Sequence, residues 1–135
     1  HKYVVAEDCG RIINPMIVDG QVHGGVAQGI GAALYEEVIY DEDGQLVSAS
    51  LADYVIPSAV EIPHMDVVHI ESCSAVAGGF RGMGEGGTIG APAAIANAVS
   101  DALSPLDINV SILPITPERI FGLLEQARMK AKGSR

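Results

Sequence analysis

The distribution of glycine constrains the fold of this chain more than any other feature of its sequence. The chain of 135 residues holds 16 glycines, most of them in two clusters, Gly20–Gly31 and Gly78–Gly90. Glycine has no side chain to pack, so such clusters indicate backbone that approaches another backbone or a bulky ligand closely. Both clusters therefore predict close contacts of the main chain.

The first cluster falls within a predicted long helix. Asn14 can cap the free N–H groups of a helix start, and Pro15 fits the first helical position. Apolar residues then recur at every fourth position, namely Val18, Val22, Val26, Ile30 and Leu34. This spacing predicts one helix from about Met16 to Glu37. Each internal glycine costs up to about 1 kcal/mol relative to alanine, so the glycines need a packing reason, and tight helix packing alone is one such reason.

The remaining pattern predicts short strands and two further helices, hence an α+β fold without internal repeats. The predicted strands are Tyr3–Ala6, Met65–Glu71 and Asn109–Pro114. A hairpin of Val38–Tyr40 and Gln45–Ser50 is predicted around a turn in which Gly44 takes a positive φ. The predicted helices are Pro92–Leu103 and a last helix with Thr116 as N-cap and Pro117 at its first position. Ser74–Gly90 is a predicted loop.

Composition argues against several classes of protein. The net charge of −9 would repel a nucleic-acid backbone. Cys9 and Cys73 show no CxxC spacing and have no nearby His at metal-ligand spacing, so we expect no zinc or iron–sulfur site within the chain. Two reduced thiols are the simpler interpretation, and a single disulfide is the alternative. The sequence shows no signal-peptide layout and no apolar run of the ~20 residues that a membrane span requires. We expect a cytoplasmic location.

One carboxylate stands out within the second glycine cluster. Glu85 lies in Gly78–Gly90, which runs directly into the predicted helix that begins at Pro92. Glycines let the main chain approach a ligand, and exposed N–H groups can bind anionic oxygens. The residues alone leave two interpretations open: a general base on a ligand-binding loop, or an ordinary surface turn. A P-loop is excluded because the Gly-Lys-Ser/Thr sequence is missing, and the third glycine of a Rossmann fingerprint is missing too.

Several motifs together carry a family resemblance. They are Cys9–Pro15, Asp19–Gly31, Ser50–Pro57, Gly82–Val99 and Leu113–Ile120. In this order, across about Val4 to Leu124, they resemble the C-terminal part of the molybdopterin-binding large subunit of the xanthine dehydrogenase/aldehyde oxidase family, closest to the carbon monoxide dehydrogenase branch. The resemblance implies that residues 1–127 are the C-terminal segment of a molybdenum-cofactor-binding domain, followed by a basic tail at 128–135.

The resemblance also implies an activity. It is molybdopterin-dependent hydroxylation, an oxidoreductase reaction that inserts water-derived oxygen at an electron-poor carbon of an aldehyde, an N-heterocycle or a similar small molecule. Glu85 corresponds to the family's general base, and Gln28, Gly84 and Gly86 are expected to contact the molybdenum–molybdopterin cofactor, whose cytosine dinucleotide form is one alternative. No residue of this chain is expected to ligate the metal. Arg81 stands where the family often has Lys; it either binds an anionic group or pairs with a surface acid.

The expected partners follow from the same resemblance. They are the remainder of the molybdenum subunit, iron–sulfur and flavin (FAD) subunits or domains, and a small-molecule substrate. Exposed apolar surface is then expected on the isolated chain, together with self-association. Two other functions remain open: a non-catalytic assembly module that completes a partner chain, and a stand-alone anion-binding domain that uses the Gly78–Gly90 loop.

Overall fold

The structure is a computed structural model that describes residues 2–133, and its contacts divide these residues into two compact units. The first unit combines the residues up to Ile30 with Pro57–Ala91. The second unit combines Gly31–Ile56 with the residues from Pro92 onward. The glycine-rich helix α1 (Pro15–Leu34) contributes to both. The fold is α+β, as predicted, with one long glycine-rich helix and two further helices of three or more turns.

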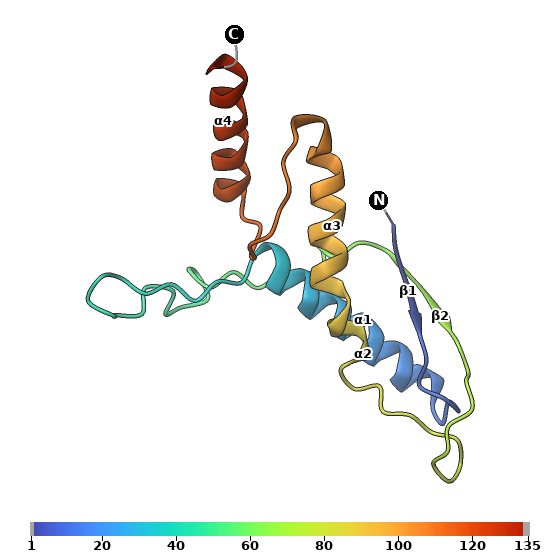
Figure 1. Cartoon of the computed structure of the whole chain (residues 1–135). Helices are drawn as coiled ribbons and strands as arrows, with labels where there is room; N and C mark the ends of the chain where they lie inside the picture. The colour runs from blue at the N-terminus through green and yellow to red at the C-terminus, as the bar shows by residue number, and fades with distance from the viewer. Residues whose placement is uncertain (1, 134–135) are drawn as a thin grey trace. The chain divides into compact units, whose positions relative to one another are not determined.

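The first unit is built on two parallel strands and most of α1. Strands β1 (Tyr3–Glu7) and β2 (Met65–His69) pair in parallel with Tyr3 opposite Met65 and Glu7 opposite His69, and Figure 1 shows them side by side. Both confirm predicted strands. The short helix α2 (Gly86–Ile89) interrupts the predicted loop 74–90.

Helix α1 begins and packs as its sequence predicts. The Oδ1 atom of Asn14 accepts a hydrogen bond from the Ile17 N–H at 3.4 Å. The apolar residues at every fourth position are all buried from Val18 to Ile30, and Val22 and Val26 are 0% exposed. This row of side chains forms the core of the first unit.

The second unit contains the turn around Gly44 and two helices. Tyr40 and Leu46 form one antiparallel bridge, and Gly44 has a φ of +79°, so the predicted turn is confirmed although its arms are not regular strands. Helix α3 spans Ala91–Leu103, with Ala91 itself in the first unit, and a 3-10 turn, η1 (Ser104–Leu106), follows.

The last helix has the predicted cap. Helix α4 spans Pro117–Gly133, and the Thr116 hydroxyl oxygen accepts a hydrogen bond from the Arg119 N–H at 3.3 Å. The helix continues unbroken through most of the segment 128–135 that we predicted as a basic tail; residues 134–135 lie outside the described residues.

The predicted strand at Asn109–Pro114 is wrong. Ile108 and Val110 are buried, which explains the alternating pattern, but their backbone has no partner strand in the described part of the chain. The Val110 N–H instead donates to the Ser100 hydroxyl at 2.9 Å, and the Ile115 N–H donates to the Ala33 carbonyl oxygen at 2.6 Å. A side chain and a helix end therefore satisfy backbone groups that a sheet would otherwise pair.

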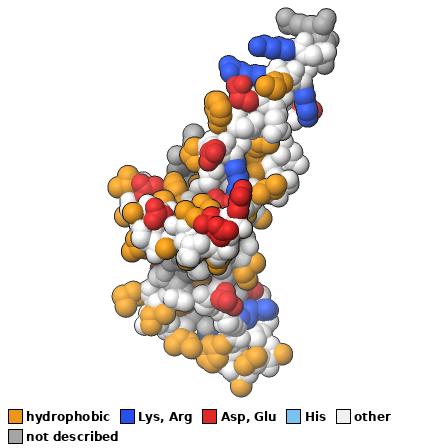
Figure 2. Space-filling model, turned by 90° about the vertical axis from the view of Figure 1, so that its left-hand side faces the viewer, with side chains coloured by type: hydrophobic (Ala, Val, Ile, Leu, Met, Phe, Trp, Pro, Cys, Tyr) orange, Lys and Arg blue, Asp and Glu red, His pale blue; other side chains and the backbone are white. Residues whose placement is uncertain are grey.

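Large hydrophobic side chains are exposed in both units. Ile13 is 78% exposed and Val60 89% in the first unit, and Leu51 is 78% exposed in the second. Figure 2 shows hydrophobic side chains at many points of the face it displays. None of the described helices combines the length and the hydrophobicity needed to cross a bilayer.

Candidate active site

Helices α1 and α2 meet backbone to backbone through two glycines. A Cβ atom on Gly25 would lie 2.9 Å from the backbone nitrogen of Thr88 and 3.0 Å from the Cα of Gly87. A Cβ on Gly87 would lie 2.5 Å from the carbonyl oxygen of Val22. These distances leave no room for a side chain at either position. The close main-chain contact predicted from the two glycine clusters is therefore present, and it joins one cluster to the other.

A hydrogen bond from α1 extends this contact to the residue before Glu85. The side-chain Nε2 of Gln21 donates to the carbonyl oxygen of Gly84 at 3.3 Å. Gln21, Gly25 and Gln28 are spaced i, i+4 and i+7, so they share one face of α1. The segment that carries Glu85 therefore lies along the same face of α1 on which Gln28 is placed.

Glu85 itself stands at the N-cap of α2 with an exposed side chain. Its backbone is in the right-handed helical region, and its carboxylate makes no capping hydrogen bond. Within residues 2–133 the carboxylate has no hydrogen-bond partner, so both oxygens are available to accept a proton or a ligand N–H.

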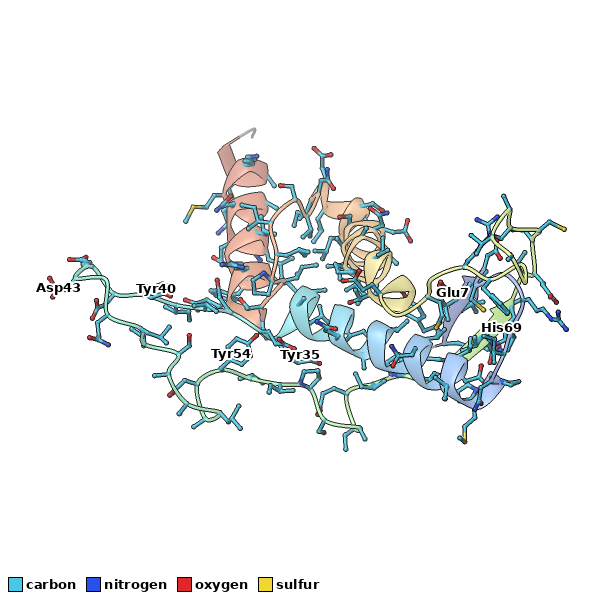
Figure 3. The ribbon with its side chains drawn as sticks, turned by 90° about the horizontal axis from the view of Figure 1, so that it is seen from below. Glu7, Tyr35, Tyr40, Asp43, Tyr54 and His69 are labelled. Atoms are coloured by element: carbon cyan, nitrogen blue, oxygen red, sulfur yellow. The ribbon has the colours of Figure 1, made fainter. Side chains whose placement is uncertain are left out.

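The glycines around Glu85 differ in whether another group occupies the space where a side chain would lie. A Cβ on Gly86 would overlap the carboxylate of Glu7, which lies at the end of β1. Figure 3 shows Glu7 and its register partner His69 at this end of the strand pair. A Cβ atom on Gly82 or Gly90 would have no neighbouring atom within 4 Å. A Cβ atom on Gly84 would have only the Nε2 of Gln21, at 3.7 Å. The backbone at Gly82, Gly84 and Gly90 is thus open to a ligand, whereas Gly86 accommodates Glu7.

The approach to the loop is held by Asp8. Its carboxylate accepts hydrogen bonds from the Ser72 hydroxyl and from the Gly10 N–H (2.9 Å), and the Nε of Arg81 lies 3.5 Å from it. The Ser72 hydrogen bond, followed by that of Gly10 and the charge of Arg81, lowers the pKa of Asp8 below its usual value. Arg81 therefore pairs with an acid of this chain, which was one of the two interpretations of it.

Backbone hydrogen bonds also join the motif Cys9–Pro15 to the segment before Glu85. The Arg11 N–H donates to Gly79 O at 2.9 Å, and the Arg81 N–H donates to Cys9 O at 2.8 Å. Gly10, with a φ of +63°, lies so close to the Gly79 carbonyl that a side chain there would overlap it. The motif Cys9–Pro15 and the segment before Glu85 thus form one structure.

The residues present fit a pterin cofactor. The Gln28 side chain is exposed and has no hydrogen-bond partner among the described residues, and an amide can both donate to and accept from a pterin ring. The open backbone at Gly82, Gly84 and Gly90 permits close approach of a flat ring. Within residues 2–133 no group of three or more His, Cys, Asp or Glu side chains is placed to hold a metal ion.

The sequence reasoning missed three residues that hold the loop: Glu7, Asp8 and Gln21. Gln21 carried a signal, because it lies one helical turn before Gly25 and so had to share its face. Asp8 and Glu7 carried no signal of their contacts with the loop, since Ser72 lies 64 residues after Asp8 and Gly86 lies still further from Glu7 in the chain.

Comparison with known proteins agrees with the resemblance. A family model described as molybdopterin cofactor-binding domain matches residues 1–63. The nicotine 6-hydroxylase large subunit of Paenarthrobacter nicotinovorans is 50% identical over 120 residues, which are 88% of this chain and 15% of the relative. The carbon monoxide dehydrogenase large chain of Afipia carboxidovorans is 35% identical over 126 residues, which are 93% of this chain and 16% of the length of that relative.

Solved structures also match this chain closely. The crystal structure of quinoline 2-oxidoreductase from Pseudomonas putida 86 matches with a TM-score of 0.88 and 52% identity over 90% of this chain and 16% of that one. The chain thus spans about 15% of the length of the curated relatives that it matches. It belongs to the xanthine dehydrogenase/aldehyde oxidase family of molybdopterin-binding molybdenum subunits and is a segment of such a subunit.

Proposed function

We propose that this segment supplies the general base of a molybdenum hydroxylase, and that Glu85 is that base. The observation that carries the proposal is the state of Glu85: an exposed carboxylate without a partner among the described residues, on a segment packed backbone to backbone against α1. A base must be free to accept a proton and must be held in place while it does so. Glu85 meets both requirements.

The other site residues would hold the cofactor. When bound, a molybdenum–molybdopterin cofactor, here proposed in its cytosine dinucleotide form, supplies the oxidising chemistry and the activated water. Gln28 would hydrogen-bond the pterin through its amide, and the backbone at Gly84 would face it without a side chain in between. Gly86 would contact the cofactor through its backbone alone. The carboxylate of Glu7 fills the space in which a side chain at this position would lie. The role of Glu85 is then to accept the proton lost by the attacking oxygen.

The substrate class that we propose is an N-heteroaromatic ring. The matched proteins named for nicotine and for quinoline are 50% and 52% identical to this chain, whereas those named for carbon monoxide are 32% to 35% identical. A ring nitrogen withdraws electrons from the neighbouring carbon, which makes that carbon open to attack by a nucleophilic oxygen. The remainder of the subunit and iron–sulfur and flavin subunits would complete a cytoplasmic enzyme and accept the electrons.

The test is Glu85→Gln in the complete, assembled enzyme, with Glu42→Gln as the matched control. Glu42 is an exposed glutamate at the turn around Gly44. We expect Glu85→Gln to lower kcat on an N-heteroaromatic substrate about 10²- to 10⁴-fold, the usual contribution of a general base. Its molybdenum content should stay that of the parent enzyme, because Glu85 is not proposed as a metal ligand. Unchanged kcat would refute the role of Glu85; a metal-free assembly would favour the non-catalytic assembly function instead.

A further inference from the structure

We propose that Gln21 is a positioning residue for Glu85, a role that rests on the proposed function of Glu85 as a base. The Nε2 of Gln21 donates to the carbonyl oxygen of Gly84, the residue immediately before Glu85. The hydrogen bond joins residues 63 positions apart in the chain, so it ties the Glu85 segment to a different element. Gln21 acts on the base through the main chain and does not itself accept the proton.

The position of this hydrogen bond allows it to fix the backbone orientation of Glu85. The carbonyl of Gly84 belongs to the peptide unit whose nitrogen is that of Glu85, and a planar peptide moves as a unit. Fixing this carbonyl therefore fixes the direction in which the chain enters Glu85. The backbone hydrogen bonds that follow are local turns, from Gly86 N–H to Met83 O at 3.2 Å and from Thr88 N–H to Glu85 O at 3.1 Å. They shape the segment without attaching it to α1.

Two contacts along one face of α1 hold the segment that carries Glu85, one on each side of this residue. The contact of Gly25 with Gly87 and Thr88 anchors the segment after Glu85, and Gln21 anchors the segment before it. Glu85 lies between the two anchors. A rigid frame on both sides is what a base requires, since small displacements from reacting distance cost rate steeply. Gln21 is exposed, so replacing it leaves the apolar core of the first unit untouched.

The test compares Gln21→Met with Gln126→Met in the complete enzyme. Methionine keeps the length of the side chain and removes the donor. Gln126 is likewise an exposed helical glutamine, but on α4. We expect Gln21→Met to lower kcat about three- to tenfold without changing KM, the factor that one hydrogen bond contributes. Gln21→Glu, which also lacks the donor when ionised, should lower kcat at least as much. Gln126→Met should leave kcat and KM unchanged.

Two readouts separate positioning from a general structural effect. First, hydrogen exchange of the peptide amides at 82–90 should be faster in Gln21→Met than in the parent and unchanged in Gln126→Met. Second, Gln21→Met should have no further effect on kcat when Glu85 is already Gln, because a positioning residue acts only through the residue it positions. Unchanged exchange, unchanged kcat, or an undiminished effect in the Glu85→Gln background would each overturn the proposal.

The same set of variants distinguishes this inference from the proposed function. A full-rate Glu85→Gln enzyme would refute Glu85 as the base and, with it, the positioning role. A slow Glu85→Gln enzyme together with a full-rate Gln21→Met enzyme would refute only the role of Gln21.

Discussion

Replacing Gly25 by alanine tests whether the contact between α1 and α2 is as close as described. The new methyl group would lie 2.9 Å from the Thr88 nitrogen and 3.0 Å from the Gly87 Cα, whereas favourable contacts between such atoms lie at about 3.5–4.0 Å. Both neighbours are main-chain atoms, so the helices must move apart. Overpacking of this kind costs about 1–3 kcal/mol.

The adjacent glycine provides the control. Gly24 has no atom within 4 Å of a built Cβ, so Gly24→Ala adds the same methyl group to the same helix in open space. Both substitutions gain the same helix propensity, about 1 kcal/mol. That gain cancels in the comparison, which leaves a difference of about 1–3 kcal/mol from the overlap alone.

Native-state hydrogen exchange in the complete subunit measures this difference locally. The amides of 84–90 should exchange about 5- to 150-fold faster in Gly25→Ala than in Gly24→Ala, which corresponds to that free energy. Equal exchange in the two variants would show that α1 and α2 are not in backbone contact at Gly25, and the frame proposed around Glu85 would then have only the Gln21 anchor.

Two further predictions concern stability. Because the pKa of Asp8 is lowered, first by the Ser72 hydroxyl, its ionised form stabilises the fold above its usual pKa of about 4, and this contribution is lost as the pH falls through the lowered value. Ser72→Ala should therefore be less stable than the parent near neutral pH in urea unfolding and should converge with it in strong acid; a gap that persists in acid would contradict this cause. Arg119 donates to Pro114 O at 2.6 Å and to the Glu37 carboxylate, so Arg119→Lys should cost about 1–2 kcal/mol in the same assay, because an ammonium cannot span both acceptors. Arg128→Lys, at an exposed pair with Glu125, should change stability by less than about 0.5 kcal/mol, and an equal loss in both variants would rule out the two-acceptor explanation.

The sequence predicted those parts of the fold that depend on local signals. The Asn14 and Thr116 caps, the spacing of four from Val18 and the turn at Gly44 each have a cause within a few residues. The strand predicted at Asn109–Pro114 was wrong because alternating burial has two causes, a sheet or an irregular segment pressed against a core. Only the hydrogen-bond partners distinguish the two causes. The Val110 N–H donates to Ser100 on the preceding helix, and the Ile115 N–H donates to Ala33, which is distant in sequence.

The candidate site was predictable in kind but not in construction. Glycine clusters indicated close main-chain contact, yet nothing local showed that Gly25 would meet Gly87 rather than a ligand. Gly86 illustrates the same limit, because its missing side chain makes room for Glu7 from a strand almost 80 residues away in sequence. Long-range pairs of this kind follow from the assembled fold, and no period or propensity encodes them.

The pairing of β1 with β2 has a practical consequence for work with this chain. A parallel ladder is normally enclosed within a wider sheet, because each outer strand presents a row of backbone groups that seek partners. Here both strands are outermost, each being only five residues long and bonded on one side within the described residues. The segment produced alone therefore offers two templates for strand addition between copies. Coexpression with the rest of its subunit, or charged substitutions at exposed positions such as Val4 and Val68, should keep it from forming intermolecular sheets.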